Sequence, residues 1–216
     1  MDEPALIGRI ASVVGHELRN PLAVIKNSAY FVKAKLGDDA DAKLVKHLGI
    51  IESEIARADR MLSDLSAFSR PLELKPKPES LNAIVTEAIE AATWPPGIKV
   101  EKKLAKPEPT VKIDAAAIQE ALRRILENAI QSMPDGGSVA VTTTLKGSWA
   151  SVVIRDGGQG FDAKALPNIL EPFFTTKPKG LGLGLAVAAK AARAHGGRLE
   201  AANVSGGAAV TLSIPA

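Results

Sequence analysis

The chain has 216 residues, is 46% hydrophobic and only 4% aromatic, and carries a formal net charge of +3 from 27 basic and 24 acidic residues. It contains no cysteine, which excludes disulfides and cysteine nucleophiles and fits a reducing compartment. No apolar run approaches the ~18 residues of a membrane span, and the start lacks a secretory pattern. We therefore expect a cytoplasmic location without membrane contact from this segment. No basic stripe with interleaved aromatic residues is present, so nucleic acid is not expected as a partner.

Two long amphipathic helices are predicted over residues 1–70, with a break at Gly37-Asp38-Asp39. Their apolar residues recur every three or four positions, which keeps them on one face of each helix. This pattern favours an antiparallel hairpin, which alone buries too little apolar surface to be stable. We therefore expect a homodimer in which two hairpins form a four-helix bundle. The apolar positions are Ile7, Ala11, Val14, Leu18, Leu22, Ile25, Ala29, Val32 and Leu36, then Leu44, Leu48, Ile51, Ile55, Ala58, Leu62 and Leu65.

Residues 71–79 contain three prolines and are predicted to be an extended linker. A second domain over residues 80–216 mixes helices and strands. Ser80 and Asp114 are expected to cap helices that run to about Ala92 and Met133. The pattern favours an α+β domain with one sheet and helices on one face. Strands are expected over 99–104, 110–113, 138–146, 150–155, 198–203 and 208–214, and a last helix from 184 to 195.

His16 lies off the apolar stripe of the first helix, about 200° around from Val14 and Leu18. The neighbouring Glu17 carboxylate can fix the imidazole tautomer and leave the other ring nitrogen free to attack. Asn20 follows one turn later on the same face, and Pro21 is expected to bend the helix. A solvated surface histidine is the alternative explanation of the same pattern.

Three further motifs lie in the second domain. Asn128 interrupts the apolar face of its helix, where an amide oxygen could complete the shell of a phosphate-bound Mg²⁺ or simply bond to nearby backbone. Asp156 follows a strand and precedes a glycine-rich turn, where it could accept a hydrogen bond from an exocyclic amine. Gly180, Gly182 and Gly184 open a helix, whose N-terminal N–H groups can bind phosphate. Their G-x-G-x-G spacing is neither the Walker nor the dinucleotide pattern.

Taken in order, these motifs resemble the sensor histidine kinases of two-component signalling. Residues 16–21 resemble the H box, 126–129 the N box, 156–160 the G1 box, 172–174 the F box and 180–184 the G2 box. The resemblance covers nearly the whole chain. It implies a dimeric all-α phosphoacceptor hairpin followed by an α+β sandwich of the gyrase-like, Bergerat type.

The resemblance also implies a function and the residues that perform it. His16 would be phosphorylated from ATP, with Glu17 as general base, and the phosphoryl group would pass to an aspartate of a response regulator receiver domain. Asn20 matches the position that orients water in phosphatase-competent relatives. Asn128 would bind Mg²⁺ and Asp156 would read adenine. The remaining nucleotide-binding positions would be Gly158, Gly160, Phe173, Lys177, Gly180, Gly182 and Gly184.

Two positions depart from the family pattern. Many relatives carry Asn four residues before the Mg²⁺-binding Asn, and related ATPases carry a water-activating Glu there, whereas this chain has Arg124. Leu181 replaces the commoner Thr of the G2 box. The stretch from Phe161 to Gly180 is short and implies a compact nucleotide lid, in which Lys177 either touches a phosphate or stays solvated. Two alternatives stay open: a pseudokinase that dimerises and binds a receiver domain, and a gyrase-like ATPase or scaffold.

Overall fold

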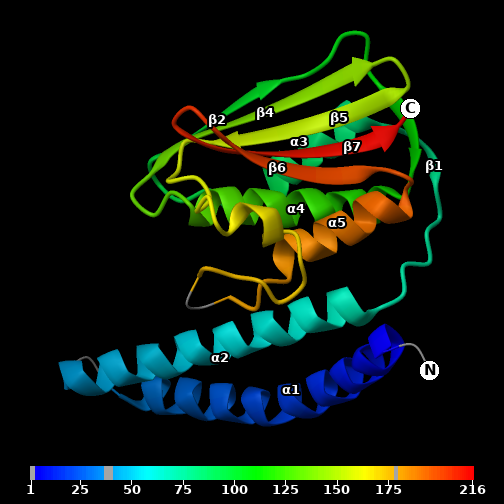
Figure 1. Ribbon diagram of the computed structural model, residues 1–216. Helices are drawn as coiled ribbons and strands as arrows, with labels where there is room; N and C mark the ends of the chain where they lie inside the picture. The colour runs from blue at the N-terminus through cyan, green and yellow to red at the C-terminus, as the bar shows by residue number, and fades with distance from the viewer. Residues whose placement is uncertain (1–2, 37–40, 178–179) are drawn as a thin grey trace. The chain divides into compact units, whose positions relative to one another are not determined.

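The computed structural model describes residues 3–36, 41–177 and 180–216, with the backbone alone for residues 3–17. The chain divides into two compact units, Met1–Pro71 and Leu72–Ala216, which are drawn in Figure 1. No helix in the described part of the chain is both long and apolar enough to cross a membrane.

The first unit is a hairpin of two helices, α1 (Glu3–Lys35) and α2 (Ala42–Ser69). They pack antiparallel along their length, and an ion pair of 2.7 Å joins Lys33 Nζ to Glu52 Oε2 across them. Asp41 caps α2 by accepting the N–H of Lys43 at 2.8 Å. The predicted break at 37–39 falls outside the described residues. Helix α1 continues through Pro21 as one element, and Figure 1 shows it curved.

The apolar stripe of this hairpin is only partly covered within one chain. Ala29, Leu48, Ile55 and Leu62 are buried between the helices. Five other stripe residues remain 41 to 48% exposed within a single chain. These open positions are Leu18, Ile25 and Val32 on α1 and Leu44 and Ile51 on α2. The side chains of Ile7, Ala11 and Val14 lie outside the described set.

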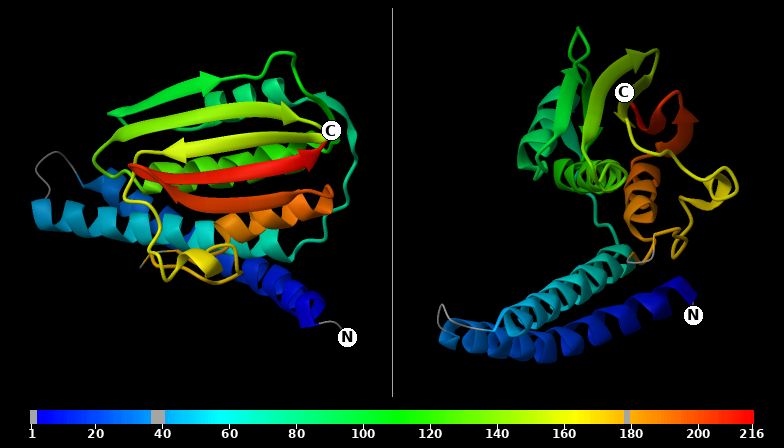
Figure 2. Two further views of the ribbon diagram at one scale, coloured as in Figure 1. Left: turned by 45° about the horizontal axis from the view of Figure 1, so that its top comes forward. Right: turned by 90° about the vertical axis from the view of Figure 1, so that its left-hand side faces the viewer.

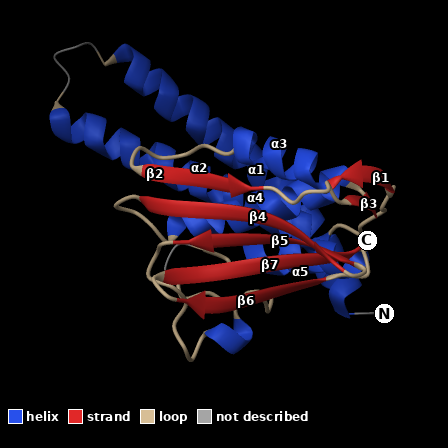
Figure 3. Cartoon of the chain, turned by 90° about the horizontal axis from the view of Figure 1, so that it is seen from above, coloured by secondary structure: helices blue, strands red, loops and turns tan. Residues whose placement is uncertain are grey.

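The second unit is built on a five-stranded sheet in the order β2-β4-β5-β7-β6. The β2–β4 pair is parallel and the other three pairs are antiparallel. Figure 3 shows all three helices of this unit on one face of the sheet, which confirms the predicted α+β arrangement. The strands are β2 (Ile98–Lys103), β4 (Gly137–Lys146), β5 (Trp149–Asp156), β6 (Arg198–Val204) and β7 (Gly207–Pro215). The helices are α3 (Leu81–Ala91), α4 (Ala115–Gln131) and α5 (Gly184–Ala194).

The core of this unit forms where the three helices meet the inner face of the sheet (Figure 2). Alternate residues of β4 and β5 point into it, because side chains in a strand alternate between its two faces. The largest side chains of this core that are almost fully buried are Leu81, Ile113, Ile118, Leu122, Ile125, Leu126, Ile154, Leu212 and Ile214.

A second, two-stranded sheet lies at the start of this unit. Strand β1 (Lys77–Ser80) pairs antiparallel with β3 (Thr110–Ile113). Residues 77–79 of the predicted linker therefore belong to a strand of the second unit. The prolines favour extended backbone, and a two-stranded ribbon has only edge strands, where Pro78 is tolerated. The prolines alone could not reveal the partner strand more than 30 residues away.

Candidate functional site

The last residue of β5, Asp156, is a carboxylate with only 3% of its surface exposed. Its Oδ1 accepts the N–H of Gly158 at 3.0 Å and lies 2.9 Å from Ser132 Oγ. Among the described residues, none donates a hydrogen bond to its Oδ2. Buried carboxylate oxygens need donors, so Oδ2 provides an acceptor for a ligand.

The glycine turn after Asp156 is packed too closely to carry side chains. A Cβ on Gly158 would lie 2.3 Å from Ser132 Oγ, and one on Gly160 would lie 2.9 Å from Asn203 Oδ1. Asn203 also accepts the N–H of Phe161 at 2.7 Å and donates to its carbonyl at 2.8 Å. The turn is therefore fixed to β6 through Asn203 and packs against Ser132 at the end of α4.

The structure brings Asn128 of α4 together with Lys177 of the segment before α5. Lys177 Nζ donates to Asn128 Oδ1 at 2.8 Å and to Gln131 Oε1 at 3.0 Å. Burial lowers the pKa of Lys177, and the negative charge of Asp156 partly opposes this shift. A cation thus lies on the amide oxygen that the sequence assigns to Mg²⁺.

Helix α5 begins with an uncapped first turn. Its N-cap residue, Leu183, makes no side-chain hydrogen bond to the helix, and the first-turn N–H groups have no acceptor within the helix. A Cβ on Gly184 would meet nothing within 4 Å, so there is open space beside these donors. This arrangement suits a phosphate group.

The segment before α5 is held by a close backbone contact. Gly182 has φ +69°, and a Cβ there would lie 2.3 Å from the carbonyl oxygen of Phe174. Gly180 is looser, with 3.6 Å from its Cβ position to Thr175 Oγ1. Phe173 also has a positive φ, 66°, and is 51% exposed. The F-box and G2-box segments therefore meet at Gly182, although they are separated in sequence.

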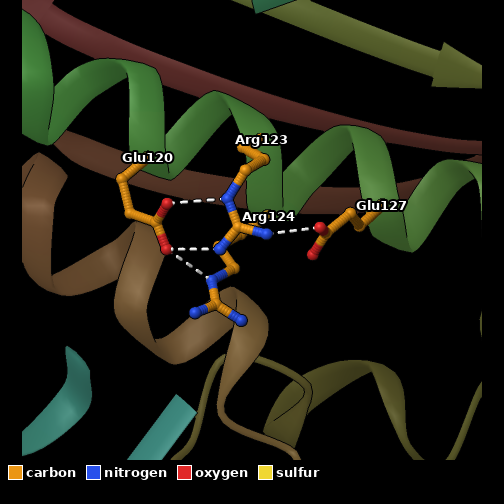
Figure 4. Close-up of polar contacts among 4 residues, drawn as sticks. All are labelled: Glu120, Arg123, Arg124 and Glu127. Carbon is orange, nitrogen blue, oxygen red and sulfur yellow. Dashed lines mark hydrogen bonds and ion pairs between the residues drawn. The ribbon is translucent and has the colours of Figure 1, made fainter. Parts of the chain in front are cut away.

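Arg124 lies on α4 one turn before Asn128, inside a group of four charged side chains (Figure 4). It is 7% exposed, and its Nε donates to Glu120 Oε1 at 2.7 Å. Arg123 binds both Glu120 oxygens, at 2.6 and 2.7 Å, and also pairs with Glu127. These four residues occupy the part of α4 where related ATPases place a water-activating carboxylate.

The electrostatics of this group work against base catalysis. Burial raises the pKa of Glu120, but hydrogen bonds and charge from Arg123 and Arg124 outweigh it, so the pKa lies below its ordinary value. A carboxylate with a lowered pKa and two arginine partners is a poor proton acceptor. Glu120 therefore does not replace the missing water-activating Glu.

The sites predicted in the first unit are only partly described. The backbones of His16 and Glu17 lie in α1, but their side chains are outside the described set, including the prediction that His16 faces away from the stripe. Asn20 is exposed. Within the described ranges, no three His, Cys, Asp or Glu side chains could hold a metal ion together.

Sequence reasoning missed three residues of this site: Gln131, Ser132 and Asn203. Gln131 lies seven positions after Arg124 and three after Asn128, so helical spacing places it on the same face of α4. That spacing was a usable signal. Nothing in the sequence connects Asn203 or Ser132 to the glycine turn, because those contacts join separate elements.

Two family models match the chain. Residues 6–73 match the His Kinase A (phospho-acceptor) domain, and residues 113–216 match the histidine kinase-, DNA gyrase B- and HSP90-like ATPase. Sensor histidine kinase ZraS of Escherichia coli O157:H7 is 29% identical over 213 residues, covering 97% of this chain and 46% of that protein. Sporulation kinase C of Bacillus subtilis is 30% identical over 206 residues, covering 94% and 47%. The chain thus spans less than half of either relative.

Solved structures share the fold. ShkA, solved in complex with AMPPNP, matches with a TM-score of 0.75 and 21% identity over 96% of this chain and 45% of its own. ThkA, solved with the response regulator protein TrrA, matches with a TM-score of 0.69 and 22% identity over 97% and 62%. With a phospho-acceptor region, an ATPase region and relatives across its length, the chain belongs to the sensor histidine kinases of two-component systems.

Proposed function

We propose that this chain is the catalytic core of an ATP-dependent protein-histidine kinase that phosphorylates His16. The observation that carries the proposal is Asp156, a buried carboxylate with one oxygen held by the protein and the other open. It shares a unit with the uncapped N-terminus of α5. The Asp156 carboxylate suits a purine amino group, and the N–H groups of the α5 N-terminus suit phosphates. The base and the phosphates of one nucleotide would therefore both have hydrogen-bond partners in this unit.

The proposed nucleotide-binding residues have separate roles in binding ATP. Asp156 accepts a hydrogen bond from the adenine amino group, and the backbones of Gly158 and Gly160 allow the base to approach. Phosphate oxygens accept hydrogen bonds from the backbone of the α5 N-terminus, where Gly180, Gly182 and Gly184 lie. Phe173, which is half exposed, is the F-box residue that contacts the nucleotide in this proposal.

Asn128 is the proposed protein ligand of Mg²⁺, through Oδ1. When bound, Mg²⁺ neutralises the phosphate charge that would otherwise repel a nucleophile. Lys177 occupies the same oxygen in the structure, so its ammonium must turn away when a metal binds there. A phosphate oxygen of the bound nucleotide then offers this ammonium a partner of opposite charge.

His16 attacks the γ-phosphorus in line. A nitrogen–phosphorus bond forms, the bond to the bridging β–γ oxygen breaks, and ADP leaves with that electron pair. Glu17 accepts the proton that the imidazole loses. The phosphoryl group then passes to a receiver-domain aspartate, and Asn20 orients water when the core removes it again. The complex of the structurally similar ThkA with a response regulator supports this choice of partner.

We also propose that the core works as a homodimer in the cytoplasm, with ATP as phosphoryl donor. The open stripe positions on α1 and α2 support the dimer, because a second hairpin would cover them and complete a four-helix bundle.

The test is incubation of the chain with γ-labelled ATP and Mg²⁺. We expect label on the protein that is acid-labile and base-stable, as a phosphoramidate is, and that disappears in His16→Gln. The matched control is His47→Gln, which removes a histidine of α2 and should keep the label. Absence of label from the wild-type chain would contradict the proposal, and free phosphate without labelled protein would favour an ATPase.

Arg124 favours a second candidate, a pseudokinase that dimerises and binds a receiver domain without phosphorylating itself. Its buried guanidinium stands where many relatives carry an amide. Arg124→Asn separates the two candidates. A pseudokinase would be silent as wild type and gain label in this variant, whereas the proposed kinase is labelled before the substitution.

A further inference from the structure

Ser132 is a residue outside every motif that nevertheless contacts the base-reading carboxylate. It forms the C-cap of α4. Its Oγ lies 2.9 Å from Asp156 Oδ1 and 2.7 Å from the carbonyl oxygen of Ala129. The hydroxyl has a single hydrogen, which the Ala129 carbonyl and Asp156 Oδ1 share as acceptors of a three-centre bond.

The contacts of Asp156 are concentrated on one oxygen. Both protein donors, the Gly158 N–H and the Ser132 hydroxyl, converge on Oδ1. Hydrogen bonds to an ionised carboxylate are short and strong. Two donors from different elements hold the carboxyl group in one rotation, and this leaves Oδ2 as the oxygen available to a ligand.

The position of the Ser132 hydroxyl is itself constrained. A Cβ on Gly158 would lie 2.3 Å from Ser132 Oγ, 2.7 Å from its Cβ and 2.7 Å from its carbonyl oxygen. The glycine turn therefore packs directly against Ser132. The end of α4 holds Ser132 in place, and Ser132 and Gly158 together hold the Asp156 carboxylate. The close packing leaves the Ser132 and Asp156 side chains little room to move.

We propose that Ser132 is a positioning residue for base recognition, which holds Asp156 Oδ2 toward the 6-amino group of adenine and so sets the preference for adenine over 6-oxopurines. This inference rests on the proposed function, in which Asp156 reads adenine. A 6-oxopurine presents a carbonyl oxygen where adenine presents a donor, so a fixed carboxylate oxygen rejects it. A carboxylate free to rotate discriminates less.

A serine at a helix end also makes a purely structural contact. Bonds from Ser Oγ to a carbonyl one turn earlier are common, and Ser53 makes one to Ile50 at 2.8 Å on α2. A capping role alone predicts a loss of stability in Ser132→Ala with no change in nucleotide preference. The two roles therefore differ in a measurable way.

The experiment compares calorimetric binding of ADP and inosine diphosphate, which differ in the C6 substituent and in the proton that the 6-oxo base carries on N1. Neither has a γ-phosphate to transfer. We expect Ser132→Ala to weaken ADP binding about tenfold, equivalent to about 1.4 kcal/mol. Binding of inosine diphosphate should change by less than about twofold, so the preference falls about tenfold. Ser132→Thr keeps the hydroxyl and should retain most of the preference.

Ser213→Ala is the matched control. Ser213 is buried, and its hydroxyl bonds to Ser151 at 2.9 Å. Ser151 lies five residues before Asp156 on β5, about 16 Å away along the strand. This variant removes a buried hydroxyl from the same unit and should leave the preference for ADP unchanged, even where the melting temperature falls.

The outcomes separate this inference from the proposed function. An unchanged preference in Ser132→Ala, with only a lower melting temperature, would overturn the inference and leave a helix cap. Asp156→Asn tests the proposed function: weakened ADP binding supports Asp156 as the base reader, whatever Ser132 does. Unchanged ADP binding in Asp156→Asn would remove the basis of both.

Discussion

Lys177 and Asp156 are oppositely charged groups of the second unit that interact through their charges but bond to different partners. Asp156 is held by two hydrogen-bond donors, whereas Lys177 bonds to two neutral amide oxygens. Burial lowers the pKa of Lys177 because its ammonium has exchanged water for amides. Because Lys177 donates a hydrogen bond to the proposed metal ligand, Asn128 Oδ1, its ammonium competes with the metal for that oxygen.

Gly182 and Gly184 give a prediction at the scale of single residues. Gly182→Ala should destabilise the second unit by at least about 1 kcal/mol, because φ is +69° and the new Cβ would meet the Phe174 carbonyl at 2.3 Å. Gly184→Ala should be neutral or stabilising, since its Cβ position is open and alanine favours a helix. Thermal unfolding of the nucleotide-free chain measures both, and equal melting temperatures would contradict the described backbone at Gly182.

Helix α4 is the element on which the site depends. Arg124, Asn128 and Gln131 share one face through spacings of four and three, and Ser132 ends the helix. Its N-terminus is fixed by Asp114, which caps it at Ala117 N (3.0 Å) and also accepts Lys75 N–H at 2.9 Å. The chain before β1 is thus tied directly to the helix that carries the site.

A histidine from the other end of the sequence joins the same contact. His195, the C-cap of α5, accepts the Asp114 N–H on Nε2 at 3.0 Å, while its Nδ1 lies 2.8 Å from the Ala191 carbonyl. The start of α4 and the end of α5 are therefore connected through one imidazole, which must be neutral at Nε2 to accept.

This arrangement predicts how stability depends on pH. Hydrogen bonds from the Lys75 N–H and the Ala117 N–H hold the pKa of Asp114 below its ordinary 3.8, against the effect of burial. A lowered carboxyl pKa stabilises the fold above about pH 4, and the effect is lost as the pH falls through the folded-state value. We expect Asp114→Ala to lower the free energy of unfolding by about 1 kcal/mol at pH 7. The loss should be smaller below pH 4, and urea unfolding measures it at both pH values.

Asp162→Ala is the matched control for this prediction. Asp162 also accepts backbone N–H groups, from Lys164 at 2.8 Å and Ala165 at 3.2 Å, but it lies in a loop and caps no long helix. Asp162→Ala should therefore lower the free energy of unfolding at pH 7 by less than Asp114→Ala does. A cost for Asp114→Ala that stays constant from pH 7 to pH 3 would contradict the assigned role of the ionised carboxylate.

At the scale of the whole molecule, the open stripe on the hairpin predicts the oligomeric state. Ile25 is 48% exposed within one chain, and a second hairpin would bury it. A carboxylate buried there without a partner is costly, so Ile25→Glu should shift the dimer to monomer and reduce the helix content of the first unit. Analytical ultracentrifugation and circular dichroism measure the two effects.

Val24→Glu is the control for that prediction. Val24 is 65% exposed and lies about 100° around the helix from Ile25, off the stripe. Val24→Glu introduces the same carboxylate in place of another apolar side chain and should leave the dimer intact. A dimeric Ile25→Glu variant, or dissociation of both variants alike, would show that the stripe is not the dimer face.

The sequence by itself determined the elements and the residues that carry the family's chemistry. Periodicity and capping residues defined the hairpin, α3, α4 and α5. The strand signals defined six of the seven strands in the described residues closely and missed only β1, because these signals act between neighbours along the chain. The motifs around His16, Asn128, Asp156 and Gly182 followed from local sequence in the same way.

Only the tertiary structure decided which distant residues meet. The pairing of β1 with β3, the lysine on Asn128 and the serine on Asp156 join segments 24 to 49 residues apart. Such contacts depend on strand register and helix packing, which propensity along the chain does not encode. The exposed part of the hairpin stripe also could not be read from the sequence. Periodicity reports only which residues share a face, whereas their burial depends on what packs against that face.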